Sequence, residues 1–90
     1  MEKIIVSVIG RDRVGVIAAV SRDLSQANAN ILDISQTIMQ DYFTMILVAD
    51  IVKCSLSFAE LKERLIKTGE EIGMQITVQR AEIFDFMHKV

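Results

Sequence analysis

Residues 3–15 read KIIVSVIGRDRVG. In residues 3–9, β-branched side chains occupy both alternating faces, which is typical of a central β-strand. Gly10 and Gly15 then enclose a short charged loop, in which Asp12 is expected to cap the helix that follows. That helix is predicted from apolar residues that recur at helical spacing, namely Val16, Ile17, Val20, Leu24 and Ala27.

Beyond this first strand and helix, the pattern predicts two strands in succession. We expect the helix to end within residues 28–30, because Asn tolerates left-handed backbone geometry and favours turns. Residues 31–39 alternate apolar and polar side chains, whereas residues 42–52 are apolar on both faces. Gln40 and Asp41 are the expected tight turn between them.

A second helix and a fourth strand complete the pattern. Ser57 and Glu60 have the spacing of a capping box, in which each side chain satisfies a backbone amide of the first turn. Gly73 is expected to close this helix, and residues 74–79 alternate like a strand with one polar side. The order is therefore strand, helix, strand, strand, helix, strand.

This order predicts a single α+β domain over residues 1–90. Right-handed crossovers give a ferredoxin-like βαββαβ fold, with a four-stranded antiparallel sheet and both helices on one face. The core covers about residues 3–80, and an apolar tail follows at residues 82–90. We expect this tail to cover the open face of the sheet or to dock on a partner subunit, two alternatives that the sequence leaves open.

Charge and composition exclude several function classes. Ten Lys and Arg against twelve Asp and Glu give a net charge of −2 with no basic run, which argues against nucleic-acid binding. The N-terminal apolar run breaks at Ser7, so we expect neither a signal peptide nor a membrane span, and a cytoplasmic location. The single cysteine, Cys54, has no neighbouring Cys or His for a metal or redox site and is interpreted as structural.

The sequence contains no constellation typical of catalysis. The one histidine, His88, lies near the C-terminus without a nucleophile motif nearby. Glu70 and Glu71 are adjacent on a helix and point in different directions, so they are interpreted as a solvated face rather than a metal site. We therefore expect no catalytic residues, no metal and no cofactor.

The loop and the later turn resemble the ACT domain family, whose members bind small molecules, often amino acids, in regulatory settings. The resemblance rests on residues 12–16, Asp-Arg-Val-Gly-Val, and on Asn30-Ile31, and it covers about residues 3–80. Val14 stands where the family usually has proline. Residues 33–37 and 42–45 are similar to those of small stand-alone prokaryotic ACT-domain proteins that are uncharacterised.

The resemblance implies a non-enzymatic protein that binds an amino acid or a similar small metabolite at the interface of a homodimer. Gly15 would let a ligand approach the helix N-terminal amides, which can take a carboxylate, while Asp12 and Asn30 would bind an ammonium group or an amide. A scaffold that binds an unidentified protein partner without a ligand is the alternative. The expected ligand-binding residues are Arg11, Asp12, Gly15, Val16, Asn30 and Ile31.

Overall fold

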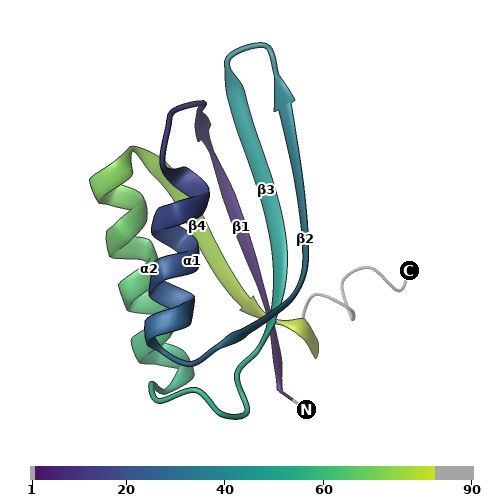
Figure 1. The fold of residues 1–90 in the computed structure, drawn as a ribbon, viewed down its shortest axis with the longest axis vertical. Helices are drawn as coiled ribbons and strands as arrows, with labels where there is room; N and C mark the ends of the chain where they lie inside the picture. Colours follow the sequence, from purple (N-terminus) through teal and green to yellow (C-terminus); the bar gives the residue numbers. More distant parts are fainter. Residues whose placement is uncertain (1, 83–90) are drawn as a thin grey trace.

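A computed structural model describes residues 2–82 of the chain. It has the predicted ferredoxin-like order, and both helices lie on the same side of the sheet (Figure 1). The elements are β1 (Lys3–Arg11), α1 (Val16–Gln26), β2 (Asn30–Met39), β3 (Tyr42–Asp50), α2 (Phe58–Ile72) and β4 (Met74–Arg80).

The sheet is antiparallel throughout, with the strand order β2-β3-β1-β4. The central strand β1 pairs on both sides, so that Val6 lies between Leu47 of β3 and Val78 of β4. Directly paired residues project to the same face of a sheet. The register therefore assigns every second residue of each strand to the helices and the others to the open face.

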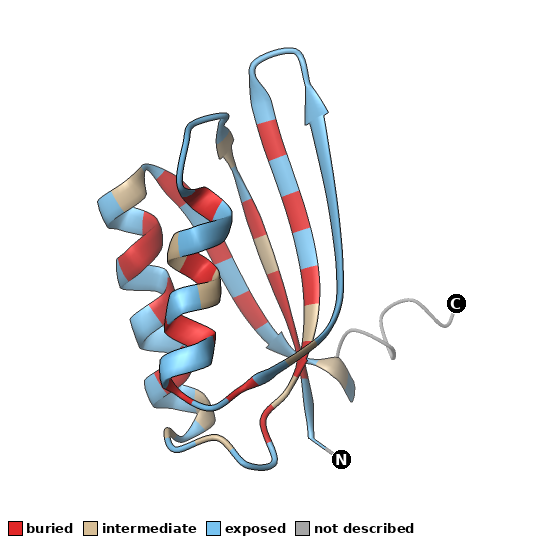
Figure 2. Cartoon of the chain, viewed as in Figure 1, coloured by how far each residue is buried: buried red, intermediate tan, exposed pale blue. Residues whose placement is uncertain are grey.

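The helix-facing side of the sheet forms the hydrophobic core. Ile4, Val6 and Val8 of β1 have no exposed surface, and buried positions alternate with exposed ones along β3 and β4 (Figure 2). Both helices contribute one buried face each. The large side chains with less than 2% exposure are Ile4, Leu24, Met45, Leu47, Leu61, Leu65, Val6, Val8 and Val20.

The open face of the sheet is polar at its edges, as the alternation predicted. The expected polar side chains are all exposed on it: Asp33, Ser35, Thr37, Gln75, Thr77 and Gln79. Ile9 and Ile46, in the middle of this face, keep 49% and 42% of their surface exposed. Residues 83–90, which we expected to cover this face or to dock on a partner, lie outside the described residues.

The boundaries of α1 differ from the prediction at both ends. Asp12 is not its N-cap, because the helix begins at Val16 and Gly15 occupies the capping position without a side-chain cap. Residues 12–15 form a loop with a turn before the helix, and the Asp12 side chain makes no capping hydrogen bond to the first turn of α1. At the other end the helix stops at Gln26, and Asn28 adopts the predicted left-handed conformation, with φ of 61°.

The β2–β3 hairpin is confirmed, with one irregularity. Gln40 has a left-handed φ of 56° in the tight turn. The pairing shifts between Ile31 and Asp33, so that Leu32 is the extra residue of a β-bulge. All but one residue of β2 are exposed, because the helices pack toward the β4 side of the sheet and cover little of β2 (Figure 1).

Helix α2 has the predicted capping box and the predicted glycine stop. The Ser57 hydroxyl accepts a hydrogen bond from the Glu60 amide at 3.1 Å, and the Glu60 carboxylate accepts one from the Ser57 amide at 3.0 Å. Gly73 ends the helix with φ of 72°. The exchange of hydrogen bonds lowers the pKa of Glu60 from its ordinary value of 4.5, chiefly through the Ser57 backbone amide.

Replacing Ser57 by Ala is expected to lower the free energy of unfolding by about 1 kcal/mol, because the Glu60 amide loses the hydroxyl that accepts its hydrogen bond. The lowered pKa of folded Glu60 means that its contribution is complete above pH 4.5 and is lost as the pH falls through the folded pKa. Urea denaturation at neutral and acidic pH measures both effects. The variant should lose less stability in acid than the parent, and Ser25→Ala on α1 is the control; equal stabilities of Ser57→Ala and parent would contradict the capping role.

Candidate functional site

The loop between β1 and α1 is fixed by two hydrogen bonds to distant parts of the chain. The Asp12 amide donates to the carbonyl of Asp41 in the β2–β3 turn at 2.8 Å. The Arg13 guanidinium donates to the carbonyl of Ile72 at the end of α2 at 2.9 Å. The loop is therefore held between the hairpin and α2, and its position does not depend on its own short sequence alone.

Gly15 at the end of this loop leaves open space beside the helix N-terminus. Its φ of 95° lies in the left-handed region, which side chains rarely adopt, and a Cβ atom at this position would meet nothing within 4 Å. No side chain caps the first turn of α1. Amides of a first helical turn have no partner within the helix, so here they are available to an external acceptor.

A groove runs from this loop to the edge strand β2. Its volume is about 430 Å³. Apolar side chains form much of its wall, with the Gln36 amide group and the loop residues as polar parts. Gln36, Ile38 and Phe43 come from the helix-facing side of β2 and β3, which α1 leaves uncovered at this end. The lining residues are Asp12, Arg13, Val14, Gly15, Val16, Ile17, Ala18, Gln36, Ile38 and Phe43.

Arg11 lies beside the groove and not in it. Its guanidinium is 3.9 Å from the Asp41 carboxylate and stacks 5.8 Å from the ring centre of Tyr42. Both partners are exposed, so this ion pair contributes little to stability. Arg11 and Asp12 instead line a shallow hollow with Gln40 and Asp41 on the other side of the loop.

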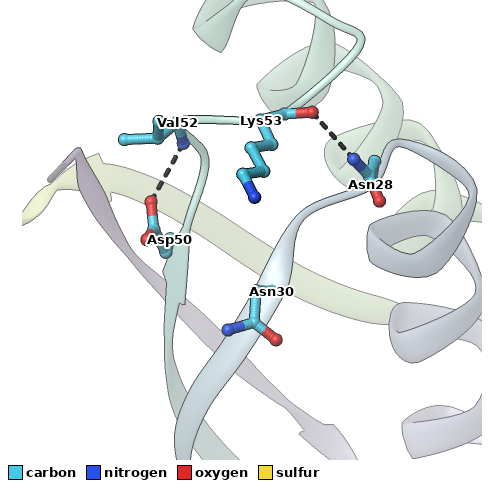
Figure 3. Close-up of a pocket in the computed structure, with 5 residues that line it drawn as sticks. All are labelled: Asn28, Asn30, Asp50, Val52 and Lys53. Carbon is cyan, nitrogen blue, oxygen red and sulfur yellow. Dashed lines mark hydrogen bonds between the residues drawn. The ribbon is translucent and has the colours of Figure 1, made fainter.

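Asn30 and Ile31 lie at the opposite end of the molecule from Gly15. Helix α1 has 11 residues and separates the two positions by about 16 Å. Asn30 lines a polar hollow with Asp50 and Lys53 (Figure 3), whereas Ile31 packs partly against the core. Within one chain, the structure thus brings Asp12, Gly15 and Val16 together and leaves Asn30 and Ile31 apart from them.

Seven of the ten groove residues were not among the expected ligand-binding residues: four neighbours of Gly15 in the loop and first turn of α1, and three strand residues, Gln36, Ile38 and Phe43. The alternation in residues 31–39 already placed Gln36 and Ile38 on one face of a strand. What the sequence did not show is that this face lies beside the helix N-terminus, because that depends on the sheet order. The exposed fraction of Ile38, 57%, shows how little of it the helices cover.

Two further features were sought within residues 2–82, a cluster of metal ligands and a membrane-spanning helix. Within residues 2–82, no three His, Cys, Asp or Glu side chains lie close enough together to hold a metal ion. None of the helices in the same range is long and apolar enough to cross a membrane.

Comparisons with known proteins agree with the fold and with the resemblance to the ACT domain family. The family model of the ACT domain matches residues 2–79. A UPF0237 protein of Methanocaldococcus jannaschii is 51% identical over 90 residues, the whole of both chains. A UPF0237 protein of Listeria innocua is 48% identical over 96% of this chain and 97% of its own. The solved structure of an ACT domain protein from Streptococcus pneumoniae is 35% identical and superposes with a TM-score of 0.81, covering 92% of this chain and 93% of its own.

Replacing Arg13 by Met is expected to loosen the loop, because the hydrogen bond to the Ile72 carbonyl is lost. The global free energy of unfolding should fall by no more than about 1 kcal/mol, since this bond is exposed. Hydrogen exchange at the Asp12 and Ala19 amides measures the opening, because the Asp12 amide donates from the loop to Asp41 and the Ala19 amide donates to the carbonyl of Gly15 at the end of the loop. Arg64→Met on α2 is the control; unchanged exchange at both amides in Arg13→Met would show that Arg13 does not position the loop.

Proposed function

Because the chain belongs to the ACT domain family, a family of regulatory ligand-binding domains, we propose that it is a non-enzymatic regulatory protein that binds an amino acid or a similar small metabolite. It acts in the cytoplasm and passes the binding signal to a protein partner. The observation that carries this proposal is the groove beside Gly15, where uncapped helix amides meet an apolar wall.

The groove offers a separate place for each part of an amino acid. The amides at the start of α1 receive the carboxylate, because they are unpaired and lie at the positive end of the helix dipole. The Asp12 carboxylate accepts from the ammonium group. Ile38 and Phe43 face the ligand's side chain, and Gln36 offers both a donor and an acceptor.

We further propose that two copies pair through the outer edge of β2. This edge has no strand partner among the described residues, and an unpaired edge is a template for a second chain. Ile34 and Ile38, 43% and 57% exposed, would be covered in such a pairing. Antiparallel pairing of two β2 strands places Asn30 of the partner subunit toward the groove of the first copy. The two parts of the predicted site, which one chain keeps apart, then meet across the interface.

Regulation follows from this arrangement by linkage. A ligand that contacts both copies binds the dimer more tightly than the separated chains, so it shifts the equilibrium toward the dimer. The shift is limited by the difference between its two affinities. The protein partner would then distinguish the two states.

A scaffold without a ligand is the second candidate function. The exposed apolar side chains near the β2–β3 hairpin favour it, because Met39 and Tyr42 keep 70% and 52% of their surface exposed. Such a surface is typical of an interface with another protein. In that case the groove would bind no ligand and would exist only because the helices leave this part of β2 uncovered.

A thermal-shift screen of the full chain against the twenty amino acids tests for a ligand. A compound at about 100 times its dissociation constant adds about 2.7 kcal/mol, which raises the midpoint by about ten degrees or more in a domain of this size. Gln36→Ala is expected to reduce the shift, and Gln75→Ala on the open face is the matched control. A rise in midpoint that is unchanged in Gln36→Ala would show that the ligand does not bind in the groove. A screen in which no compound raises the midpoint would favour the scaffold.

The dimer is tested by placing a charge on the unpaired edge. Ile34→Lys is expected to convert the dimer to a monomer, because a lysine on an edge strand opposes further strand pairing. Size-exclusion chromatography with light scattering measures the mass. Ile66→Lys, on α2 and similarly exposed at 37%, is the control that should stay dimeric. A parent chain that is monomeric, or an Ile34→Lys variant that remains a dimer, would exclude this interface.

A further inference from the structure

An apolar track runs along the open face of the sheet, on the side away from α1 and α2 (Figure 1). It consists of Ile5 and Ile9 of β1 and of Val48 and Ile46 of β3, and these β3 residues pair with Ile5 and Ser7. The neighbouring residues of β2 and β4 on the same face are polar. An apolar strip with a polar border is typical of a surface that another segment covers.

The two ends of this track differ in how far they are exposed. Ile5 keeps 6% of its surface exposed and Val48 is half-buried, whereas Ile9 keeps 49%. Ile5 is buried without belonging to the core between the sheet and the helices, so its burial does not come from α1 or α2. The track is therefore already shielded from water at the Ile5 end, and the rest of it is open.

Strand β4 ends at the shielded end of the track. Gln79 pairs directly with Ile5, and Arg80 is the last residue of the strand. The Arg80 guanidinium stacks 4.3 Å from the ring centre of Phe58 and lies 3.4 Å from the Glu2 carboxylate. These contacts fix the place where the chain leaves the sheet.

The sequence after β4 has the pattern of an amphipathic helix. Residues 81–82 have helical backbone, and they turn away from α1 and α2 at the lower end of the sheet (Figure 1). The following residues, 83–90, read IFDFMHKV and repeat apolar side chains at i, i+3, i+4 and i+7. In a helix, one face would hold Ile83, Phe86, Met87 and Val90, and the opposite face Asp85, His88 and Lys89.

We propose that residues 83–90 continue this helix and pack with its apolar stripe on the apolar track of the same chain. The lengths agree, because a helix of residues 81–90 is about 15 Å long and the strand from Ile5 to Ile9 spans about 14 Å. The helix begins beside the shielded end of the track and covers the open part as it runs toward Ile9. Both apolar surfaces are then removed from water together.

The spacing of the stripe also matches that of the track. From Ile83 to Met87 a helix rises about 6 Å, and two residues of a strand span about 7 Å. With Ile83 beside Ile5, Met87 therefore lies over Ile46, which is two residues further along the sheet on the neighbouring strand.

The occupant is the chain's own segment, because the segment starts where the track starts. A segment tethered by a short linker has an effective concentration in the millimolar range, which a second copy reaches only in very concentrated solution. Pairing of two copies through the outer edge of β2 extends the sheet and leaves its open face uncovered. The inference therefore stands independently of the proposed dimer.

The test is a disulfide between residues 46 and 87 in the full chain. Cys54 is replaced by Ser, so that Ile46→Cys and Met87→Cys supply the only two thiols. Mild oxidation is expected to join them within one chain, at least about tenfold faster than it joins Met87→Cys to a cysteine at position 66. Ile66→Cys on α2 is the matched control, because Ile66 and Ile46 are similarly exposed, at 37% and 42%. Mass spectrometry and electrophoresis without reductant distinguish a bond within a chain from a bond between chains.

A second measurement leaves position 87 unchanged. In the Cys54→Ser chain with Ile46→Cys alone, the rate of maleimide labelling reports how far the track is covered. Phe86→Asp is expected to raise this rate by about tenfold or more, because a charge on the apolar stripe opposes burial. His88→Asp places the same charge on the opposite face of the helix and should leave the rate unchanged.

Each outcome decides for or against this placement. A disulfide within one chain, together with faster labelling in Phe86→Asp, supports it. Disulfides that form only between two chains would overturn it in favour of the segment of a second copy. Equal oxidation rates at positions 46 and 66, or equal labelling in Phe86→Asp and its parent, would also overturn it, because residues 83–90 would then not cover the track.

Discussion

The pairing of β1 with strands on both sides is the interaction on which the rest of the structure depends. Ile4, Val6 and Val8 are fully buried between the neighbouring strands and the helices, so β1 holds the core together. The chain that leaves β1 is then fixed by the Asp12 amide on the hairpin turn and by Arg13 on the end of α2. The position of the groove beside Gly15 is therefore a consequence of the central strand and of what packs around it.

The edge position of β2 gives the molecule its asymmetry. The other edge strand, β4, buries Met74, Ile76 and Val78 beneath the helices, whereas β2 has no buried residue. Apolar side chains such as Ile38 are thus left exposed on a strand whose outer edge has no partner. The same feature supports the proposals of a ligand, a dimer and a protein partner, because each of these would cover apolar surface that the isolated chain leaves in water.

The two ends of α1 lie beside different kinds of surface, one with an apolar wall and one with charged and amide side chains. At its N-terminus, open backbone amides meet an apolar wall beside Gly15. At its C-terminus, Asn28 turns the chain so that charged and amide side chains surround a polar hollow. The charged residues that line the groove are those of the loop, Asp12 and Arg13, whereas the hollow is lined by an acid and a base, Asp50 and Lys53. The length of the helix keeps the two apart in one chain.

The sequence by itself determined the order of the elements, their faces and most of their ends. Alternation and helical spacing report local geometry, and the capping box of Ser57 and the stops at Asn28 and Gly73 depend on neighbours along the chain. The wrong assignment of Asp12 as a helix cap marks the limit of such reasoning, because its loop is held by contacts with Asp41 and Ile72 that are distant in sequence. Only the tertiary structure decided that Gln36 and Phe43 line one groove with Gly15, and that Asn30 lines a separate hollow with Asp50 and Lys53. Which residues share a site depends on strand order and register, and no local pattern in the chain records these.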